Sequence, residues 1–292
     1  MARLMIMLVS ALLLAGCQAQ KVLNVLTPTK GYEVANNLVY DDRTGLRLDV
    51  YEPHDVKGAP VVVFLYGGRW QNGGKDLYRW VGQALASRGY VAVLPNLRNF
   101  PETQFPGFVE DAAAALAWSS RKIHHYGGDP QRLFVMGHSS GAHIAALLAL
   151  DERYLADQNL EPRQLRGMIG LAGPYDFLPI SAADLRQIFA PAADSAQTQP
   201  IHFARRGAPP LLLMHGEADE TVSPKNTANL RDAMVRAGGA VDTVFYDKMD
   251  HARLLGALAA PLRRLGDVLP TIDNFIRKHS GLPPLPPEPE LN

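Results

Sequence analysis

The chain has 292 residues, with 29 basic and 29 acidic side chains and a hydrophobic share of 47%. Such a chain can bury a real core, as one large α/β domain or as two small domains. The balanced charge gives no electrostatic reason to expect nucleic acid or an acidic partner, and the single cysteine, Cys17, excludes an intrachain disulfide and a zinc site built on cysteines.

The N-terminal segment has the pattern of an export signal. Arg3 is the only charged residue among residues 1–16, and an apolar run over residues 4–14 is too short to cross a bilayer as a helix. Residues 14–17, Leu-Ala-Gly-Cys, resemble the lipobox of bacterial lipoproteins, which implies cleavage before Cys17 and acylation of that cysteine. Gln18 resembles the sorting pattern for the outer membrane of the bacterial envelope. The alternative is a plain secretory signal that is cut a few residues later.

Beyond the leader, the pattern predicts a tether over residues 17–36 and one α/β domain over residues 37–280. Apolar runs alternate with segments rich in helix formers, which predicts a single doubly wound, mostly parallel sheet. The predicted strands are 47–51, 61–66, 90–95, 132–136, 168–173, 211–214 and 242–246, and the predicted helices are about 76–87, 108–124, 142–151, 224–237 and 261–278. Residues 174–206 contain four prolines and predict a small cap, and the proline-rich residues 281–292 predict an extended tail.

A nucleophile motif lies between a predicted strand and a predicted helix. Residues 137–141 read Gly-His-Ser-Ser-Gly, the Gly-x-Ser-x-Gly pattern of a nucleophile elbow. The sharp turn would hold Ser139 in a strained conformation, and Gly137 and Gly141 would remove side chains that collide there. The alternative is an ordinary tight turn with a solvated serine.

Serine needs a base, and the base needs a carboxylate that orients it. Loops after two later strands supply Asp219 and His251, and the order Ser139, Asp219, His251 is the one that the α/β-hydrolase architecture requires. The segment 215–222, His-Gly-x-x-Asp-x-x-Val, resembles the acid loop of α/β-hydrolase esterases, which places the acid at Asp219. Glu217 is the second candidate for the acid.

Three other histidines, His138, His143 and His215, are expected to fill structural hydrogen-bond roles. Their spacing is not that of a zinc protease, so no metal site is predicted.

The loop after the 61–66 strand is a candidate oxyanion hole. Residues 66–70, Tyr-Gly-Gly-Arg-Trp, resemble the His-Gly-Gly-x-Trp loop of esterases and kynurenine formamidases. The resemblance implies that the backbone N–H groups of Gly67, Gly68 and Ser140 bind the oxyanion. A tyrosine replaces the histidine of that family and an arginine replaces its third glycine. The alternative is a simple tight turn at the two glycines.

Two further segments of the sequence make the resemblance to carboxylesterases more specific. Residues 99–101 and 108–112 look like the segment before the elbow in carboxylesterases related to prenylcysteine methylesterases, and residues 170–176 look like the start of their cap. The resemblance covers residues 37–280 and implies a serine carboxylesterase that needs no cofactor and acts on a small or medium ester. Trp70, Phe177 and Phe189 are expected to line the substrate pocket, with plain core or cap packing as the alternative.

The same three catalytic residues would serve an amidase, a formamidase or an acyltransferase. A catalytically inactive envelope scaffold is the alternative from another class. The pattern leaves the oligomeric state, the acyl group and the alcohol open.

Overall fold

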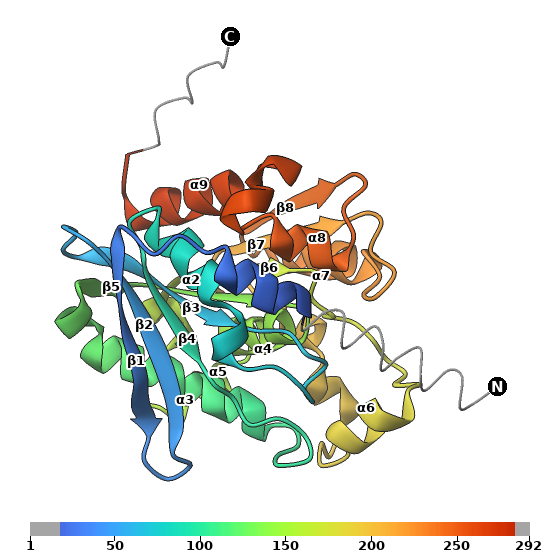
Figure 1. Cartoon of the computed structure of the whole chain (residues 1–292). Coiled ribbons are helices and arrows are strands. Elements are labelled where there is room, and N and C mark those ends of the chain that lie inside the picture. The colour runs from blue at the N-terminus through green and yellow to red at the C-terminus, as the bar shows by residue number, and fades with distance from the viewer. Residues whose placement is uncertain (1–17, 284–292) are drawn as a thin grey trace.

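The structure is a computed structural model that describes residues 18–283. The predicted leader, the lipidation candidate Cys17 and most of the predicted tail lie outside the described residues. One eight-stranded sheet has the order β1-β2-β4-β3-β5-β6-β7-β8 (Figure 1). Its strands are β1 (Tyr32–Asp41), β2 (Leu46–Pro53), β3 (Ala59–Leu65), β4 (Val91–Pro95), β5 (Gly128–His138), β6 (Leu165–Leu171), β7 (Leu211–Gly216) and β8 (Val241–Tyr246).

The strands from β4 to β8 along the sheet are parallel to one another, and β1 and β2 extend one side as antiparallel strands. The predicted single, mostly parallel sheet is therefore confirmed. All seven residues of β3 are buried, because a parallel strand with helices on both faces has no side that meets water.

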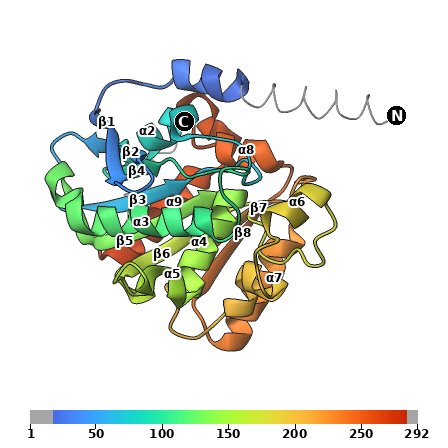
Figure 2. The same cartoon turned by 90° about the horizontal axis from the view of Figure 1, so that it is seen from below.

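Helices cover both faces of this sheet, with α2 and α9 on one face and α3, α4 and α7 on the other (Figures 1 and 2). The α-helices are α2 (Arg79–Ala86), α3 (Gly107–Lys122), α4 (Ser140–Leu150), α5 (Glu152–Ala156), α6 (Ala183–Ile188), α7 (Lys225–Ala237), α8 (His251–Gly256) and α9 (Val268–Ser280). Short 3₁₀ helices are η1 (Lys75–Leu77), η2 (Ile123–Tyr126), η3 (Pro162–Gln164), η4 (Ser195–Thr198), η5 (Pro200–Phe203) and η6 (Ala260–Leu265). No helix within residues 18–283 is long and apolar enough to cross a bilayer.

The segment before the sheet differs from the predicted tether. Residues 18–25 are helical, and β1 already begins at Tyr32. The Gln20 side chain donates to the Tyr78 hydroxyl at 3.1 Å, and the Asn24 side chain donates to the carbonyl of Asp76 at 2.6 Å. The segment is therefore packed against the domain from its first described residues.

The sequence analysis did not predict strand β1, because the alternation of buried and exposed residues is interrupted within it. Its register shifts between Ala35 and Leu38, where Asn37 adopts a φ of 58°. The Asn37 N–H donates to the Asp49 carboxylate on β2 at 2.7 Å. Such a bulge breaks the alternation of buried and exposed residues by which a strand is recognised.

The last predicted helix, 261–278, is divided in two. The chain forms η6 up to Leu265, passes through Gly266 in extended backbone, and forms α9 from Val268. A Cβ at Gly266 would lie 2.3 Å from Met249 Cε, so the chain packs too closely there for a side chain. Residues 174–206 contain α6, η4 and η5 and no strand, as expected for an irregular insertion.

A buried ion pair ties β2 to the loop that follows β3. Lys75 is 2% exposed and Asp49 is 4% exposed, and the Lys75 ammonium lies 2.9 Å from one Asp49 oxygen and 3.0 Å from the other. Burial disfavours the charged ammonium, but the hydrogen bonds to Asp76 and Asp49 outweigh burial and raise the pKa of Lys75. The pair therefore holds its charges inside the protein.

Replacement of Lys75 by methionine is expected to lower the free energy of unfolding by about 3–5 kcal/mol, because Asp49 is left buried without its counter-charge. Urea denaturation followed by circular dichroism measures the change. The double variant Lys75→Met/Asp49→Leu, which removes both charges, is the matched control and should recover much of the loss. Equal losses in the single and double variants would contradict this account.

Candidate active site

Ser139 lies at the turn between β5 and α4, at the carboxyl edge of the sheet. Its backbone has φ 55° and ψ −125°, a conformation that a residue with a side chain rarely adopts. The Ser139 N–H donates to the carbonyl of Leu171, at the end of the neighbouring strand β6, at 2.9 Å. This is the strained strand-to-helix turn of a nucleophile elbow.

The two glycines of the motif make this turn possible. A Cβ at Gly137 would lie 2.2 Å from the carbonyl oxygen of Gly141. A Cβ at Gly141 would lie 2.1 Å from the carbonyl oxygen of Leu65, at the end of β3. Since neither position has room for a side chain, α4 can cross closely above the ends of β3 and β5.

Asp219 is a buried carboxylate, 6% exposed, whose two oxygens have different partners. Oδ1 accepts the backbone N–H groups of Thr221 at 2.8 Å and Val222 at 2.9 Å. Oδ2 lies 2.7 Å from His251 Nδ1 and 3.2 Å from His215 Nε2. Burial disfavours the charge, but the hydrogen bonds from His215, His251 and Val222 outweigh it and hold the pKa of Asp219 below its ordinary value. Asp219 is therefore ionised, and Glu217, the second candidate acid, is exposed to solvent.

His215 supports the carboxylate from the end of β7. Its Nε2 faces the carbonyl oxygen of Val222 at 2.9 Å as well as Asp219, so this nitrogen carries the proton. Its Nδ1 then accepts the Thr227 hydroxyl at 2.8 Å. The expected structural role of His215 is thus a support for the acid loop.

His251 is the first residue of α8, and its side chain is 16% exposed. A second histidine holds its backbone, since His138 Nε2 donates to the His251 carbonyl at 3.1 Å and the two rings lie 4.6 Å apart. Because His138 directly precedes Ser139, this contact brings the His251 backbone beside the elbow. Burial, and secondarily the charge of His251, lowers the pKa of His138 to about 3, so His138 remains neutral. The elbow pattern itself gave no signal of this contact.

The Ser139 hydroxyl makes no side-chain hydrogen bond to any residue between 18 and 283 in this structure. The Asp219–His251 half of the hydrogen-bonded row is thus formed, and the Ser139–His251 half is open. Catalytic hydrogen bonds of this kind often become short only when substrate is bound.

The glycine loop after β3 lies directly against Ser139. A Cβ at Gly67 would lie 2.9 Å from Ser139 Cβ, so only glycine fits beside the nucleophile candidate. The Ser140 N–H belongs to the first turn of α4, where backbone N–H groups have no acceptor within the helix. Gly67 and Ser140 both lie directly beside Ser139, where an oxyanion would need donors.

The Gly68 amide, expected to bind the oxyanion, has a hydrogen-bond partner in this structure. Its N–H donates to the Ser140 side-chain oxygen at 3.0 Å, a contact that joins the glycine loop to the start of α4. A Cβ at Gly68 would lie 1.9 Å from the carbonyl oxygen of Asn72, so a glycine is still required here. In this structure the Gly68 amide fixes the loop and does not point to an empty site.

The next two residues of the loop are held in unusual conformations. Arg69 has φ 58° and Trp70 has φ 59°, both in the left-handed region. Arg69 Nε and Nη2 donate to the Asp184 carboxylate on α6 at 2.7 and 3.1 Å, and the Gln71 side chain donates to the same carboxylate at 3.0 Å. The hydrogen bonds from Arg69 hold the pKa of Asp184 below its ordinary range. The insertion 174–206 is therefore clamped to the glycine loop.

Trp70, Phe177 and Phe189, which the sequence indicated as pocket residues, are in mutual contact. The Trp70 ring lies 5.9 Å from Phe177 and 5.0 Å from Phe189. It also meets the ring of His143, four residues after Ser139 on α4, at 5.1 Å. Trp70 and Phe189 are buried, at 6% and 4% exposure. The three aromatic residues thus form one cluster, which contacts His143, one helical turn after Ser139 on α4.

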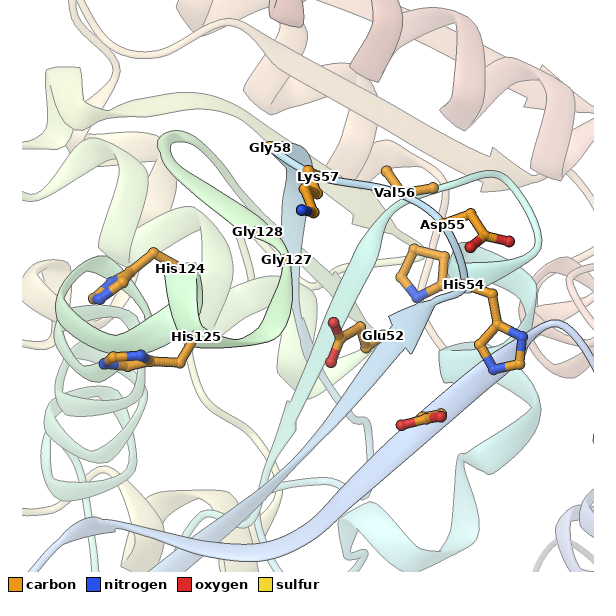
Figure 3. A pocket seen from close by; sticks show the side chains of 12 residues that line it. Glu52, His54, Asp55, Val56, Lys57, Gly58, His124, His125, Gly127 and Gly128 are labelled. Atoms are coloured by element: carbon orange, nitrogen blue, oxygen red, sulfur yellow. The ribbon is translucent and has the colours of Figure 1, made fainter.

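An open depression lies at the opposite edge of the sheet (Figure 3). It is lined at the amino ends of β3 and β5, by Gly58 and Gly128 among others, and His124 and His125 stand at its rim. Within residues 18–283, neither this depression nor any other place has a group of three or more His, Cys, Asp or Glu side chains that could hold a metal ion. Because β5 runs from Gly128 to the elbow, the whole length of the strand separates this depression from Ser139.

The chain is similar to proteins of one family. A family model described as BD-FAE matches residues 48–234. Over 254 residues, the chain is 30% identical to a probable isoprenylcysteine alpha-carbonyl methylesterase of Oryza sativa subsp. japonica, with 79% of this chain and 59% of the relative covered. It is 31% identical to Esterase LipQ of Mycobacterium tuberculosis, with 74% of this chain and 55% of the relative covered. The chain thus spans less than two thirds of the length of these relatives.

A solved structure supports the same assignment. The apo form of Thermogutta terrifontis esterase 2 superposes with a TM-score of 0.73 at 25% identity, over 88% of this chain and 98% of the esterase. The eight-stranded sheet described above is therefore the α/β-hydrolase fold, and the chain belongs to the BD-FAE family of α/β-hydrolase carboxylesterases.

Proposed function

We propose that the protein is a serine carboxylic ester hydrolase that acts on a small or medium ester through Ser139, His251 and Asp219. The observation that carries the proposal is the 2.7 Å hydrogen bond between Asp219 and His251, next to the strained turn at Ser139. A buried, ionised carboxylate on Nδ1 keeps that nitrogen protonated and leaves Nε2 as the base.

In the proposed mechanism, the Ser139 oxygen attacks the ester carbonyl while His251 Nε2 takes the hydroxyl proton. Asp219 orients the imidazole and stabilises its positive charge. His251 then gives the proton to the leaving alcohol, which leaves an acyl group on Ser139. A water molecule, deprotonated by His251, releases the acid and restores the serine.

The oxyanion is assigned to the N–H groups of Gly67 and Ser140. Gly67 is supported by its close approach to Ser139, and Ser140 by its place in the first turn of α4. The Gly68 amide, which donates to Ser140, is assigned the role of fixing the loop. Loss of one oxyanion donor typically lowers turnover by about 10²–10³.

The names of the relatives support an ester as substrate. They include methylesterases and esterases, and Thermogutta terrifontis esterase 2 is also described as phosphorylated by paraoxon, with a TM-score of 0.72 at 25% identity. The cluster of Trp70, Phe177 and Phe189 is proposed to bind the apolar part of the substrate, since aromatic side chains predominate in such pockets.

The proposal extends to location. We propose that the mature protein begins at Cys17, carries acyl chains on that residue and is anchored in the bacterial cell envelope, at the outer membrane. The support is the Leu-Ala-Gly-Cys sequence of residues 14–17 after an apolar leader. Several acyl chains on one residue give a stable anchor, because each buried methylene contributes about 0.8 kcal/mol.

Replacement of Ser139 by alanine is expected to lower the turnover of p-nitrophenyl butyrate by roughly 10⁶, to background, because the nucleophile is lost. The rate of p-nitrophenol release measures it. Paraoxon should add one phosphoryl group to the wild type and none to the variant, as measured by mass spectrometry of the peptide that contains residue 139.

Ser87→Ala, at the C-terminus of α2, is the matched control and should keep the wild-type rate. An unchanged rate in Ser139→Ala with native circular dichroism would rule out the mechanism. A panel of esters, anilides and formamides, with and without added alcohol, tests ester hydrolysis against amide hydrolysis and acyl transfer by the products formed.

Replacement of Asp184 by asparagine is expected to lower kcat up to about tenfold, which corresponds to about 1.4 kcal/mol, because the glycine loop loses its clamp beside Ser139. Stability should change by at most about 1 kcal/mol, since the Arg69–Asp184 pair is partly exposed. Steady-state kinetics and urea denaturation measure the two effects.

Asp242→Asn, which breaks the exposed pair between Asp242 and Lys278, is the control and should leave kcat unchanged. An identical kcat in Asp184→Asn and the wild type would mean that the loop keeps its shape without the clamp.

A further inference from the structure

The first described helix, residues 18–25, and the turn that follows it present a group of large apolar side chains to solvent. On the side that faces the protein, Gln20 donates to the Tyr78 hydroxyl, Asn24 donates to the carbonyl of Asp76, and Leu23 packs against the core. Apolar residues on the other side face outward. A surface helix of a water-soluble domain normally buries its apolar stripe and exposes its polar one.

The outward side consists of Val22, Val25 and Leu26, which we call the apolar face. These residues are 55%, 85% and 55% exposed, and they make up three of the six exposed large apolar side chains within residues 18–283. Their spacing of three and four residues places them together on one side of the helix. They are therefore one patch and not scattered exposures.

We propose that the apolar face lies in the surface of the membrane that holds the acylated Cys17. The inference rests on the proposed lipid anchor and is independent of the proposed hydrolase chemistry. The described chain begins at Gln18, one residue after Cys17, so the acyl chains would enter the bilayer immediately beside this helix. An amphipathic helix next to a lipid anchor can bury its apolar side at the boundary of headgroups and acyl chains.

The charges around the apolar face suit an anionic lipid surface. Lys21 lies one helical turn before Val25 and is exposed, and Lys30 is exposed after the helix. The nearby acidic residue Asp76 is paired with the ammonium of Lys75 at 2.9 Å. Lysine side chains beside an apolar stripe favour lipid headgroups over a second copy of the same basic surface.

The surface on which this helix packs lies close to the glycine loop. The Tyr78 hydroxyl, which accepts from Gln20, donates to the carbonyl of Gly67 at 3.3 Å. Figures 1 and 2 show the helix, in dark blue, lying over α2. Two hydrogen bonds therefore connect the membrane-facing helix with the loop beside Ser139, and the candidate active site is held near the lipid surface.

The single cysteine makes a direct test possible. Because acylation blocks Cys17, the full-length variant Val25→Cys carries one free thiol that can take the fluorophore NBD. In vesicles of phosphatidylethanolamine and phosphatidylglycerol, its emission is expected to shift to the blue and to be quenched by a lipid-borne nitroxide. The matched control is Val235→Cys on α7, a residue that is 63% exposed, and its emission should stay as in water.

Each other outcome overturns the inference. Water-like emission from both labels would mean that the apolar face stays in solvent, and equal blue shifts would mean that the contact is not confined to this helix. A blue shift without vesicles, together with a doubled mass in size-exclusion chromatography, would assign the face to a second copy of the chain. Uptake of NBD by the wild type would show an unacylated Cys17 and remove the anchor.

Hydrolysis of soluble p-nitrophenyl butyrate by each labelled variant checks the fold separately, since neither valine belongs to the catalytic residues. A failed membrane contact with full hydrolysis leaves the proposed function standing. Absence of hydrolysis in the wild type, together with a blue shift of labelled Val25→Cys on vesicles, would overturn the proposed function and leave the membrane contact standing.

Discussion

The close approach of α4 to the ends of β3 and β5 is the constraint on which the site depends. A side chain at Gly141 would collide with the carbonyl oxygen of Leu65 on β3. A side chain at Gly67 would collide with the side chain of Ser139. Both contacts exist only because two backbones meet without side chains between them. The strained conformation of Ser139 follows from this crossing, and so does the position of the loop beside it. On a wider turn, the serine side chain would not project above the sheet, and the backbone of Gly67 would not lie beside it.

Around this crossing, the protein uses histidines more often for position than for charge. His138 holds the backbone of His251, His215 holds the carboxylate of Asp219, and His143 donates to the carbonyl of Thr198 at 2.7 Å. Burial lowers the pKa of His143 to about 4 and that of His138 to about 3, so both are neutral at ordinary pH. A neutral ring can support the site without adding a positive charge that would compete with His251 for Asp219.

The sequence predicted most of the sheet and the candidate catalytic residues, because both have local patterns. Ser139 follows a buried apolar run directly, and Asp219 and His251 follow later ones, so the parallel sheet brings them to one edge. Strand β1 was missed because its bulge at Asn37 breaks the alternation. The single helix predicted over 261–278 was wrong, because the backbone at Gly266 packs against Met249.

Contacts between distant segments had no such pattern. The Arg69–Asp184 clamp spans 115 positions, and the Gly68–Ser140 hydrogen bond spans 72. Each depends on where residues 174–206 and α4 lie in the fold, which is decided by packing over the whole domain. The sequence indicated that the glycine loop could bind an oxyanion. It gave no sign that the Gly68 amide donates to the Ser140 side chain.

The contact of Gln20 with Tyr78 has a practical consequence for production of this protein. Gln20, in the first described helix, donates a hydrogen bond to the same tyrosine that donates to the Gly67 carbonyl. A heterologous export signal or affinity tag is therefore best joined ahead of Gln18. A junction placed after Thr27 would expose the surface formed by η1 and α2 and remove the hydrogen bond from Gln20 to Tyr78, which contacts the loop beside Ser139.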